Sequence, residues 1–211
     1  MKRKLLIEKR DGKIRTYFIE NDDIVEIHSS PASGGEEDRH RLGDIYIGKV
    51  NNIVPNIGAA FIEIEKGINC YYDMKDADTA IFTHKSGKKP LCIGDELVVQ
   101  ISREAIKTKA PTVTSNLSFT GRYAVLTHGN TRIGVSSKIS KSLRETYKKE
   151  LSGLQNDDFG IIVRTNAKDA PFQDVTEEIS ALKDEYYSLI HTAQTRVCFS
   201  CLKSAPPPTD N

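Results

Sequence analysis

Aromatic residues in the middle of the chain are spaced as in surfaces that bind single-stranded nucleic acid. In AAFIEIE, residues 59–65, aliphatic side chains alternate with others, so Phe61 faces outward if the aliphatic ones form the core. Antiparallel pairing with the next segment would place Tyr71 or Tyr72 beside Phe61. Bases stack on such rings, with a gain of about 1 to 3 kcal/mol per base. The same spacing fits equally well if Phe61 packs beneath residues 77–90. A stacking surface and a packed side chain therefore both stay open as interpretations.

Basic residues lie in two connections that could border the same surface. One connection contains Lys85, Lys88 and Lys89, and the other contains Arg103, Lys107 and Lys109. Surface lysines are common, so a lysine-rich turn taken alone is more often only solvated. Aromatic rings and cations on one module are the stronger indication of RNA binding.

A second candidate site is the end of the apolar segment FGIIVRT, residues 159–165. The planar fork of Arg164 suits a phosphate group, and the hydroxyl of Thr165 supplies a further donor. The alternative is an arginine that pairs with a carboxylate of Asp157, Asp158 or Asp169. The residues alone favour the ion pair.

The other reactive side chains do not form a recognisable site. Cys198 and Cys201 form a single C-x-x-C without a second pair of ligands, which favours two packed cysteines over zinc. The five histidines are dispersed, and no nucleophile has a flanking base or a glycine elbow. A hydrolase triad is therefore not predicted.

Five short β segments that would position these residues lie between residues 42 and 119, and they predict a small barrel. The segments are IYIGKVNNIV, AAFIEIE, INCYY, DELVVQIS and TVTSNLSF. Alternation in the fourth and fifth predicts one buried face each. Before them, residues 3–28 predict a three-stranded meander with turns at Asp11-Gly12 and at residues 21–23.

After Gly121 the pattern changes to strands mixed with helices. Ser142 and Glu145 have the spacing of a capping box for a helix near residues 142–154, and a second helix is expected over about residues 174–192. The sequence thus predicts a β-rich α+β protein. Its predicted domains are a meander (1–39), a five-stranded barrel (40–119), an α/β region (120–204) and a tail (205–211).

Charge and hydropathy exclude some classes of function. The 211 residues contain 30 Lys and Arg against 29 Asp and Glu, so the net charge does not attract anions. An anionic partner must therefore bind at a local cluster of basic residues. No apolar run approaches the roughly 20 residues that span a bilayer, and the N-terminus lacks the apolar stretch of a secretory signal. A cytoplasmic protein without a membrane partner is expected.

Several segments together resemble the N-terminal half of the bacterial ribonuclease E/G family, in order and in spacing. They are IYIGKVNNIVPNIGAAFIEI, GDELVVQISREAIKTKAP, TVTSNLSFTGRYAVL, IGVSSKI and FGIIVRTNA. The resemblance implies an S1 domain, which is an OB-fold barrel, inserted between a meander that belongs to a ribonuclease H-like subdomain and a 5′-sensor region. It implies RNA binding by Phe61, Tyr71 and Lys109. Arg103 and Lys107, from the basic connection described above, are expected to assist. It also implies that a 5′-monophosphate is bound by Arg164, Thr165, Gly121 and Val125.

The resemblance also bears on activity and partners. In the family, magnesium-binding aspartates and a zinc link lie in a later part, so this chain is expected to hold neither metal and to be inactive alone. Its expected partner is single-stranded RNA, preferably 5′-monophosphorylated; the chain itself is expected to be monomeric, although the family oligomerises. The family's Ser-Arg-Arg is Ser136-Ser137-Lys138 here, which weakens one phosphate contact. A stand-alone S1 adaptor or regulator without nuclease activity is the alternative.

Overall fold

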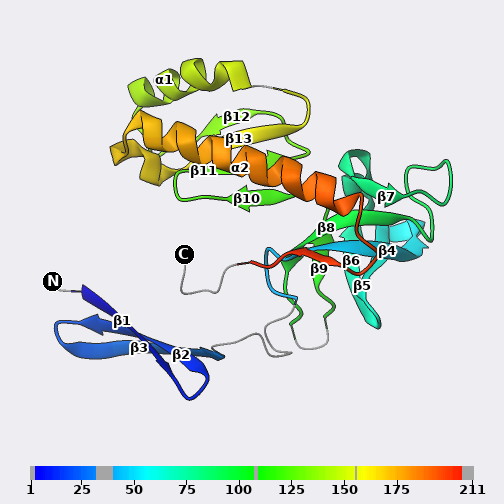
Figure 1. The fold of residues 1–211 in the computed structure, drawn as a ribbon, viewed down its shortest axis with the longest axis horizontal. Helices are drawn as coiled ribbons and strands as arrows, with labels where there is room; N and C mark the ends of the chain where they lie inside the picture. Colours follow the sequence, from blue (N-terminus) through cyan, green and yellow to red (C-terminus); the bar gives the residue numbers. More distant parts are fainter. Residues whose placement is uncertain (1–2, 32–39, 107–108, 155, 206–211) are drawn as a thin grey trace. The chain divides into compact units, whose positions relative to one another are not determined.

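The structure is a computed structural model that describes residues 3–31, 40–106, 109–154 and 156–205. The chain divides into two compact units: Met1–Arg41 with Ala205–Asn211, and Leu42–Ser204. Figure 1 shows three strands in the first unit, and a barrel together with a helix-covered sheet in the second. The domain boundaries given above stay predictions.

The first unit is the expected antiparallel meander. Its strands are β1 (Arg3–Arg10), β2 (Lys13–Glu20) and β3 (Asp23–Pro31), in the order β1-β2-β3. Asp11 and Gly12 have φ values of 53° and 69°, which is the geometry of a two-residue type I′ hairpin turn. The second turn contains only Asn21 and Asp22, because Glu20 already pairs with Asp23; the expected three-residue turn is wrong.

A closed five-stranded barrel begins the second unit, as the sequence predicts. It is built from β4 (Ile45–Val54), β5 (Ala59–Glu65), β6 (Ile68–Asp73), β8 (Glu96–Arg103) and β9 (Thr112–Thr114). The strand order is β4-β5-β6-β9-β8, and antiparallel pairing of β4 with β8 closes it. Two strands that the sequence does not predict extend this sheet: β7 (Phe82–His84) beside β8, and β14 (Cys201–Lys203) beside β4. Short 3-10 helices, η2 (Pro55–Ile57) and η3 (Met74–Thr79), follow β4 and β6.

The fifth predicted segment is two strands and not one. β9 ends at Thr114, where the Thr114 hydroxyl accepts from the Asn116 N–H at 3.0 Å, and Leu117 N–H turns back to the Ser115 carbonyl at 2.9 Å. These local bonds replace ladder bonds, which is the usual effect of Ser, Thr and Asn in a turn. The chain then enters β10 (Ser118–Thr120) of a different sheet.

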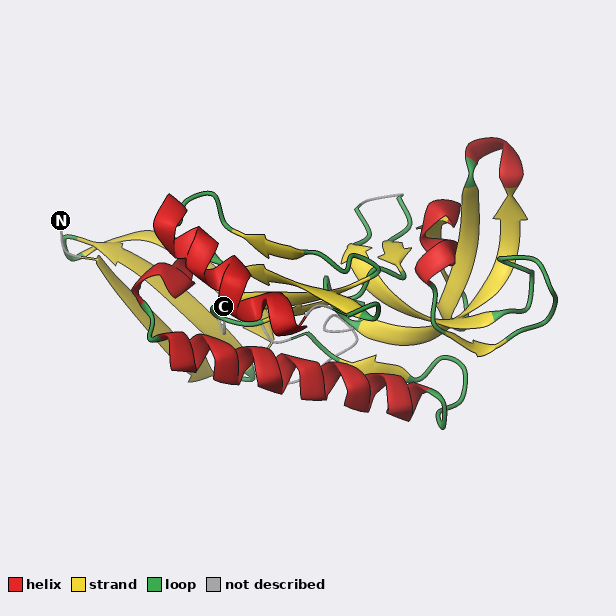
Figure 2. Cartoon of the chain, turned by 90° about the horizontal axis from the view of Figure 1, so that it is seen from above, coloured by secondary structure: helices red, strands yellow, loops and turns green. Residues whose placement is uncertain are grey.

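That sheet has four strands and carries both long helices. It contains β10, β11 (Ala124–His128), β13 (Phe159–Val163) and β12 (Ile133–Val135) in that order, with β12 parallel to β13. The helices are α1 (Lys141–Leu151) and α2 (Phe172–Ala193), with the short η4 (Ser152–Leu154) and η5 (Thr165–Asp169). Figure 2 shows α2 running along the sheet, where it packs on β10 and β11, and α1 contacts β12.

Helix α1 does not begin with the predicted capping box. Its N-cap is Ser140, whose hydroxyl accepts from the Leu143 N–H at 3.4 Å. Ser142 already lies inside the first turn, so its hydroxyl cannot serve as the cap. The second helix is close to its expected position.

Strand β8 separates two hydrophobic cores. Leu97, Val99 and Ile101 fill the barrel, while Val98 faces the other way, into the core beneath α2. The Gln100 amide on that face bonds to the carbonyls of Gly43 and Ser118 at 3.0 Å each. The expectation of one buried face is therefore wrong for β8, because the α/β region covers its outer side. None of the helices in the described residues is long and apolar enough to cross a membrane.

Candidate nucleic-acid interface

Phe61 and Tyr71 lie side by side on the outer surface of β5 and β6. They are direct cross-strand partners, and their rings make an edge-to-face contact with centroids 6.5 Å apart at 87°. Both side chains are half-buried. Tyr72 points inward instead: it is fully buried, its hydroxyl lies 2.8 Å from Ser115 Oγ, and burial raises its pKa. Tyr71 is thus the tyrosine that shares a surface with Phe61.

Phe61 is not part of either hydrophobic core of the described residues. The barrel core takes Ala60, Ile62 and Ile64 from the same strand, which is the opposite set of the alternation. The ring of Phe61 rests against Tyr71 at the surface, so it offers an aromatic edge and face to a ligand. Phe61 thus lies outside both cores, and its role in RNA binding stays a prediction.

Two of the predicted RNA-binding cations lie at the end of β8 and in the connection between β8 and β9. The Tyr71 N–H donates to the Pro111 carbonyl at 2.8 Å, which brings this connection against β6. Lys109 is exposed two residues earlier, and Arg103 is exposed at the end of β8. Lys107 lies outside the described residues. Arg103 pairs with Thr112, which in turn pairs with Tyr71, so these cations belong to the strand and the connection that adjoin β9, the neighbour of β6.

The other lysine-rich connection is organised differently. Asp95 is fully buried, and its carboxylate accepts from Lys85 Nζ at 2.6 Å and from the N–H groups of Ser86 and Cys92 at 2.7 Å each. Burial alone would raise the pKa of Asp95, but these donors outweigh it and hold that pKa below its ordinary value of 3.8. Lys85 therefore helps to fix the loop through its bond to Asp95; Lys85, Lys88 and Lys89 are all exposed, and their place beside a groove stays a prediction.

We expect Asp95→Asn to destabilise the barrel by about 2 kcal/mol at pH 7, because the amide keeps only one acceptor oxygen for three donors. The folded-state pKa of Asp95 is depressed, so its contribution is present above about pH 4 and is lost as the pH falls through the folded pKa. The difference between the variant and the parent protein should shrink between pH 7 and pH 3. Urea midpoints at both pH values measure it, and an unchanged difference would contradict the role given to the carboxylate.

The four residues predicted to bind a 5′-phosphate are gathered where β11 begins and β13 ends. Val125 pairs with Ile162, and the Arg164 N–H donates to the Tyr123 carbonyl at 2.7 Å. The Arg164 side chain is exposed, and its Nη1 donates to the carbonyl of Gly121. No ion pair of Arg164 occurs among the described residues, so the pairing that the residues alone favoured is not found.

Thr165 has a partner that strengthens this site. Its hydroxyl lies 2.8 Å from Ser136 Oγ, and the Ser136 N–H donates to the Val163 carbonyl at 2.9 Å. Ser136 comes from the connection after β12, which runs parallel to β13 and so ends at the same edge of the sheet. The sequence gives Ser136 no role of its own, because the family's Ser-Arg-Arg departs here at Ser137 and Lys138; in the structure Ser136 hydrogen-bonds to the Thr165 hydroxyl.

The turn from Gly121 to Ala124 is held by a residue that sequence reasoning missed. Glu178 of α2 accepts from the N–H groups of Arg122, Tyr123 and Ala124 at 2.9, 2.7 and 2.8 Å. A Cβ added to Gly121 would collide with this carboxylate, which explains the glycine. Successive N–H groups of this kind form an anion-binding nest, and here the protein's own carboxylate fills it.

No group of three or more potential metal ligands occurs among the described residues. The cysteines are free, with Cys198 half-buried and Cys201 exposed. Cys198 Sγ approaches the Ile47 carbonyl at 3.9 Å, whereas Cys201 Sγ lies 3.6 Å from Ser204 Oγ. The two thiols thus have separate partners.

Comparison with known proteins gives one consistent relationship. A family model described as "Ribonuclease E/G family" matches residues 118–210. Ribonuclease E of Synechocystis sp. is 30% identical over 160 residues, covering 74% of this chain and 24% of that protein. Ribonuclease G of Salmonella typhimurium and ribonuclease G of Escherichia coli K12 are 27% and 26% identical over 194 residues, covering 87% of this chain and 39% of each relative.

The matched part of these relatives is limited: the chain spans between 24% and 39% of their length. Within that span, the family match covers the sheet and α2, which hold Arg164, Thr165 and Glu178. The matches to ribonucleases E and G extend over most of the chain. The chain is similar to proteins of the ribonuclease E/G family over most of its length.

Proposed function

We propose that this chain binds single-stranded RNA on the outer face of β5 and β6, and holds the 5′-monophosphate of that RNA at the end of β13. Its relatives are ribonucleases, which makes RNA the expected ligand. In the whole protein this part would bind the RNA and recognise its 5′ end, for an endoribonuclease of RNA processing and decay. Cleavage itself would need a magnesium-bound hydroxide held by aspartates elsewhere.

The observation that carries the proposal is the half-buried pair of Phe61 and Tyr71 on the outer surface of β5 and β6, with the exposed Lys109 two residues before the Pro111 that bonds to Tyr71. Proteins that bind single strands combine rings on which bases stack with cations that follow the backbone. The Phe61–Tyr71 pair lies on the outer surface of the barrel and does not belong to the barrel core. Packing of that core therefore does not account for the pair.

Phe61→Ala is expected to weaken binding of a 12-nucleotide single-stranded RNA about fivefold or more, whatever its sequence, because one stacking platform is lost. Fluorescence anisotropy at several salt concentrations measures this. The salt slope should stay unchanged in Phe61→Ala and fall by about 0.7 in Lys109→Ala, which removes one phosphate contact.

The matched control is Phe172→Ala, which removes another partly exposed ring, at the start of α2. It should leave RNA affinity unchanged. Parent-like affinity in Phe61→Ala, with parent-like thermal unfolding, would contradict the barrel as the RNA-binding face. A loss of folding in Phe61→Ala would instead support a packing role for the ring.

A further inference from the structure

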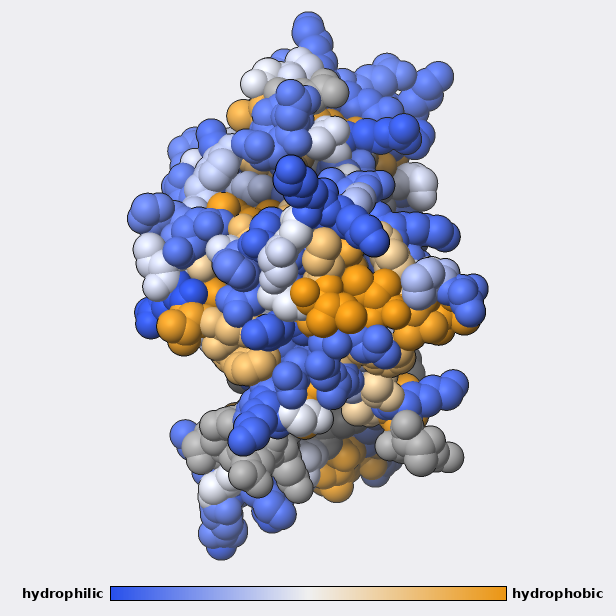
Figure 3. Space-filling view, turned by 90° about the vertical axis from the view of Figure 1, so that its right-hand side faces the viewer, coloured by the Kyte–Doolittle hydropathy of each residue, from blue (hydrophilic) through white to orange (hydrophobic). Residues whose placement is uncertain are grey.

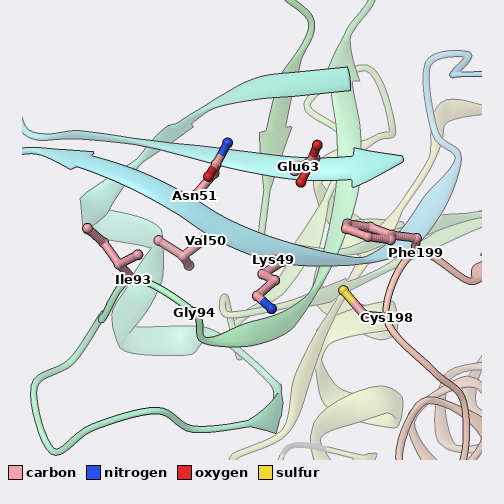
Figure 4. Close-up of a pocket in the computed structure, with 8 residues that line it drawn as sticks. All are labelled: Lys49, Val50, Asn51, Glu63, Ile93, Gly94, Cys198 and Phe199. Atoms are coloured by element: carbon pink, nitrogen blue, oxygen red, sulfur yellow. The ribbon is translucent and has the colours of Figure 1, made fainter. Parts of the chain in front are cut away.

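A pocket of about 370 Å³ lies on the outside of the barrel, where the segment after α2 meets β4 and β5. Its lining residues are Lys49, Val50, Asn51, Glu63, Ile93, Gly94, Cys198 and Phe199. Figure 4 shows the ring of Phe199 directed into the space between Glu63 and Cys198. Ile93, which also lines the pocket, is 60% exposed. Figure 3 shows that hydrophobic side chains gather on one face of the molecule, surrounded by polar ones.

Phe199 is held in an unfavourable backbone conformation. Its φ is 69°, in the left-handed region that a bulky side chain rarely adopts. Two bonds to β4 fix it: the Phe199 N–H donates to the Ile47 carbonyl at 2.8 Å, and the Ile47 N–H donates to the Ser200 carbonyl at 3.0 Å. Strained residues persist where the surroundings force them, and they cluster at ligand sites.

The pocket continues the surface that carries Phe61. Along β4, Asn52 pairs with Phe61, Lys49 pairs with Glu63, and Ile47 bonds to Phe199. Phe61 and Glu63 are two residues apart on β5 and project from the same face, about 7 Å apart. Phe199 therefore follows Phe61 and Glu63 along the β5 edge of β4, beyond the part of β5 that pairs with β4.

The polar groups of the pocket suit the edge of a base. Glu63 Oε1 accepts from the Gly67 N–H at 2.7 Å, and no hydrogen bond to Oε2 occurs among the described residues. Lys49 forms no ion pair among those residues, so its ammonium group is available. Asn51 lies at a register shift in β4, where bulges often redirect a side chain, and its amide donates to Asn69 Oδ1 at 3.1 Å.

Cys198 does not add a negative charge to the pocket. Burial raises the pKa of its thiol to about 11, so it stays protonated at neutral pH. The pocket thus presents one ring, one cation, one carboxylate and a neutral apolar wall to a ligand.

We propose that this pocket is a second base-binding subsite, in which a nucleobase with an exocyclic amino group stacks on Phe199 and donates to Glu63. The inference rests on the proposed function, because the base belongs to the same RNA strand that stacks on Phe61. Cytosine, adenine and guanine carry such an amino group, whereas uracil has a carbonyl oxygen in its place and keeps only the ring N3–H as a donor on this edge. The subsite therefore discriminates against uracil.

The test compares the affinities of the full chain for 12-nucleotide oligo(C) and oligo(U) RNA at neutral pH. These two bases differ at this edge in an amino group against a carbonyl. The parent protein should prefer oligo(C), and Glu63→Gln should bring the ratio close to one, because an amide serves either base. Phe199→Asn removes the ring while keeping a residue that tolerates the left-handed conformation, and it should weaken oligo(C) binding about fivefold or more.

The controls separate this subsite from the barrel face. Phe172→Ala, which removes a ring of similar exposure, should leave both affinities unchanged. If Phe61→Ala weakens binding but Phe199→Asn does not, or if Glu63→Gln keeps the preference for oligo(C), the subsite is overturned and the proposed function stands. If the parent protein binds neither RNA, the proposed function fails and the subsite fails with it.

Discussion

Arg164→Ala is expected to abolish a preference of about tenfold for 5′-monophosphorylated RNA over the same RNA with a 5′-hydroxyl. A terminal monophosphate carries about 1.5 to 2 negative charges at neutral pH, and a guanidinium fork matches its oxygens in geometry as well as charge. The bond from Nη1 to the Gly121 carbonyl orients this fork and leaves its other donors for a ligand. Competition binding with the two RNAs measures the ratio.

Two further variants define what the arginine contributes. Arg164→Lys keeps the charge without the fork, so a reduced preference should remain. Arg103→Ala should weaken both RNAs alike and keep the ratio, because Arg103 lies at the barrel end of β8. Equal affinities for the two RNAs in the parent protein would reject the sensor, and so would an unchanged ratio in Arg164→Ala.

Glu178→Ala is expected to destabilise the second unit by about 2 to 4 kcal/mol, because three N–H groups lose a charged acceptor. The Ala124 N–H is the most costly of these, since Ala124 is fully buried. The midpoint of thermal unfolding should fall by roughly 4 to 16 °C for a chain of this size. Far-UV circular dichroism is the suitable probe, because the chain contains no tryptophan.

Glu177→Ala is the matched control, since it removes a neighbouring exposed carboxylate that bonds only to Gln173 of the same helix in this structure. It should change stability by less than about 0.5 kcal/mol. The 5′-phosphate preference should also fall in Glu178→Ala, because the turn that carries Gly121 loses its anchor. A parent-like unfolding temperature in Glu178→Ala would show that other contacts hold this turn.

Much of the barrel could be predicted because its strands follow a simple alternation. IYIGKVNNIV and AAFIEIE match β4 and β5 residue for residue. The strands that were missed have only three residues each: β7 and β14 are too short to show a period, and β10 continues the alternation of β9 without a visible break. Their places depend on which sheet has room for them, and the alternation carries no such information.

The candidate sites also combine features that the sequence could predict with features that it could not. The pairing of Phe61 with Tyr71 follows from the alternation and a short hairpin, so the sequence could anticipate it. The roles of Glu178 and Asp95 could not be anticipated in this way. Glu178 acts on a turn that precedes it by more than fifty residues, and Asp95 binds Lys85 in a loop where three donors converge on the buried carboxylate.

The shared strand β8 has a consequence for how the two proposed RNA contacts work together. Because Val98 is buried in the core beneath α2 while Leu97 and Val99 fill the barrel, the two proposed contact sites belong to one compact unit. The distance between the two proposed contacts then sets the shortest RNA that can reach both. An RNA shorter than the span between them can engage only one contact, so binding strength should rise in a step with RNA length and not gradually.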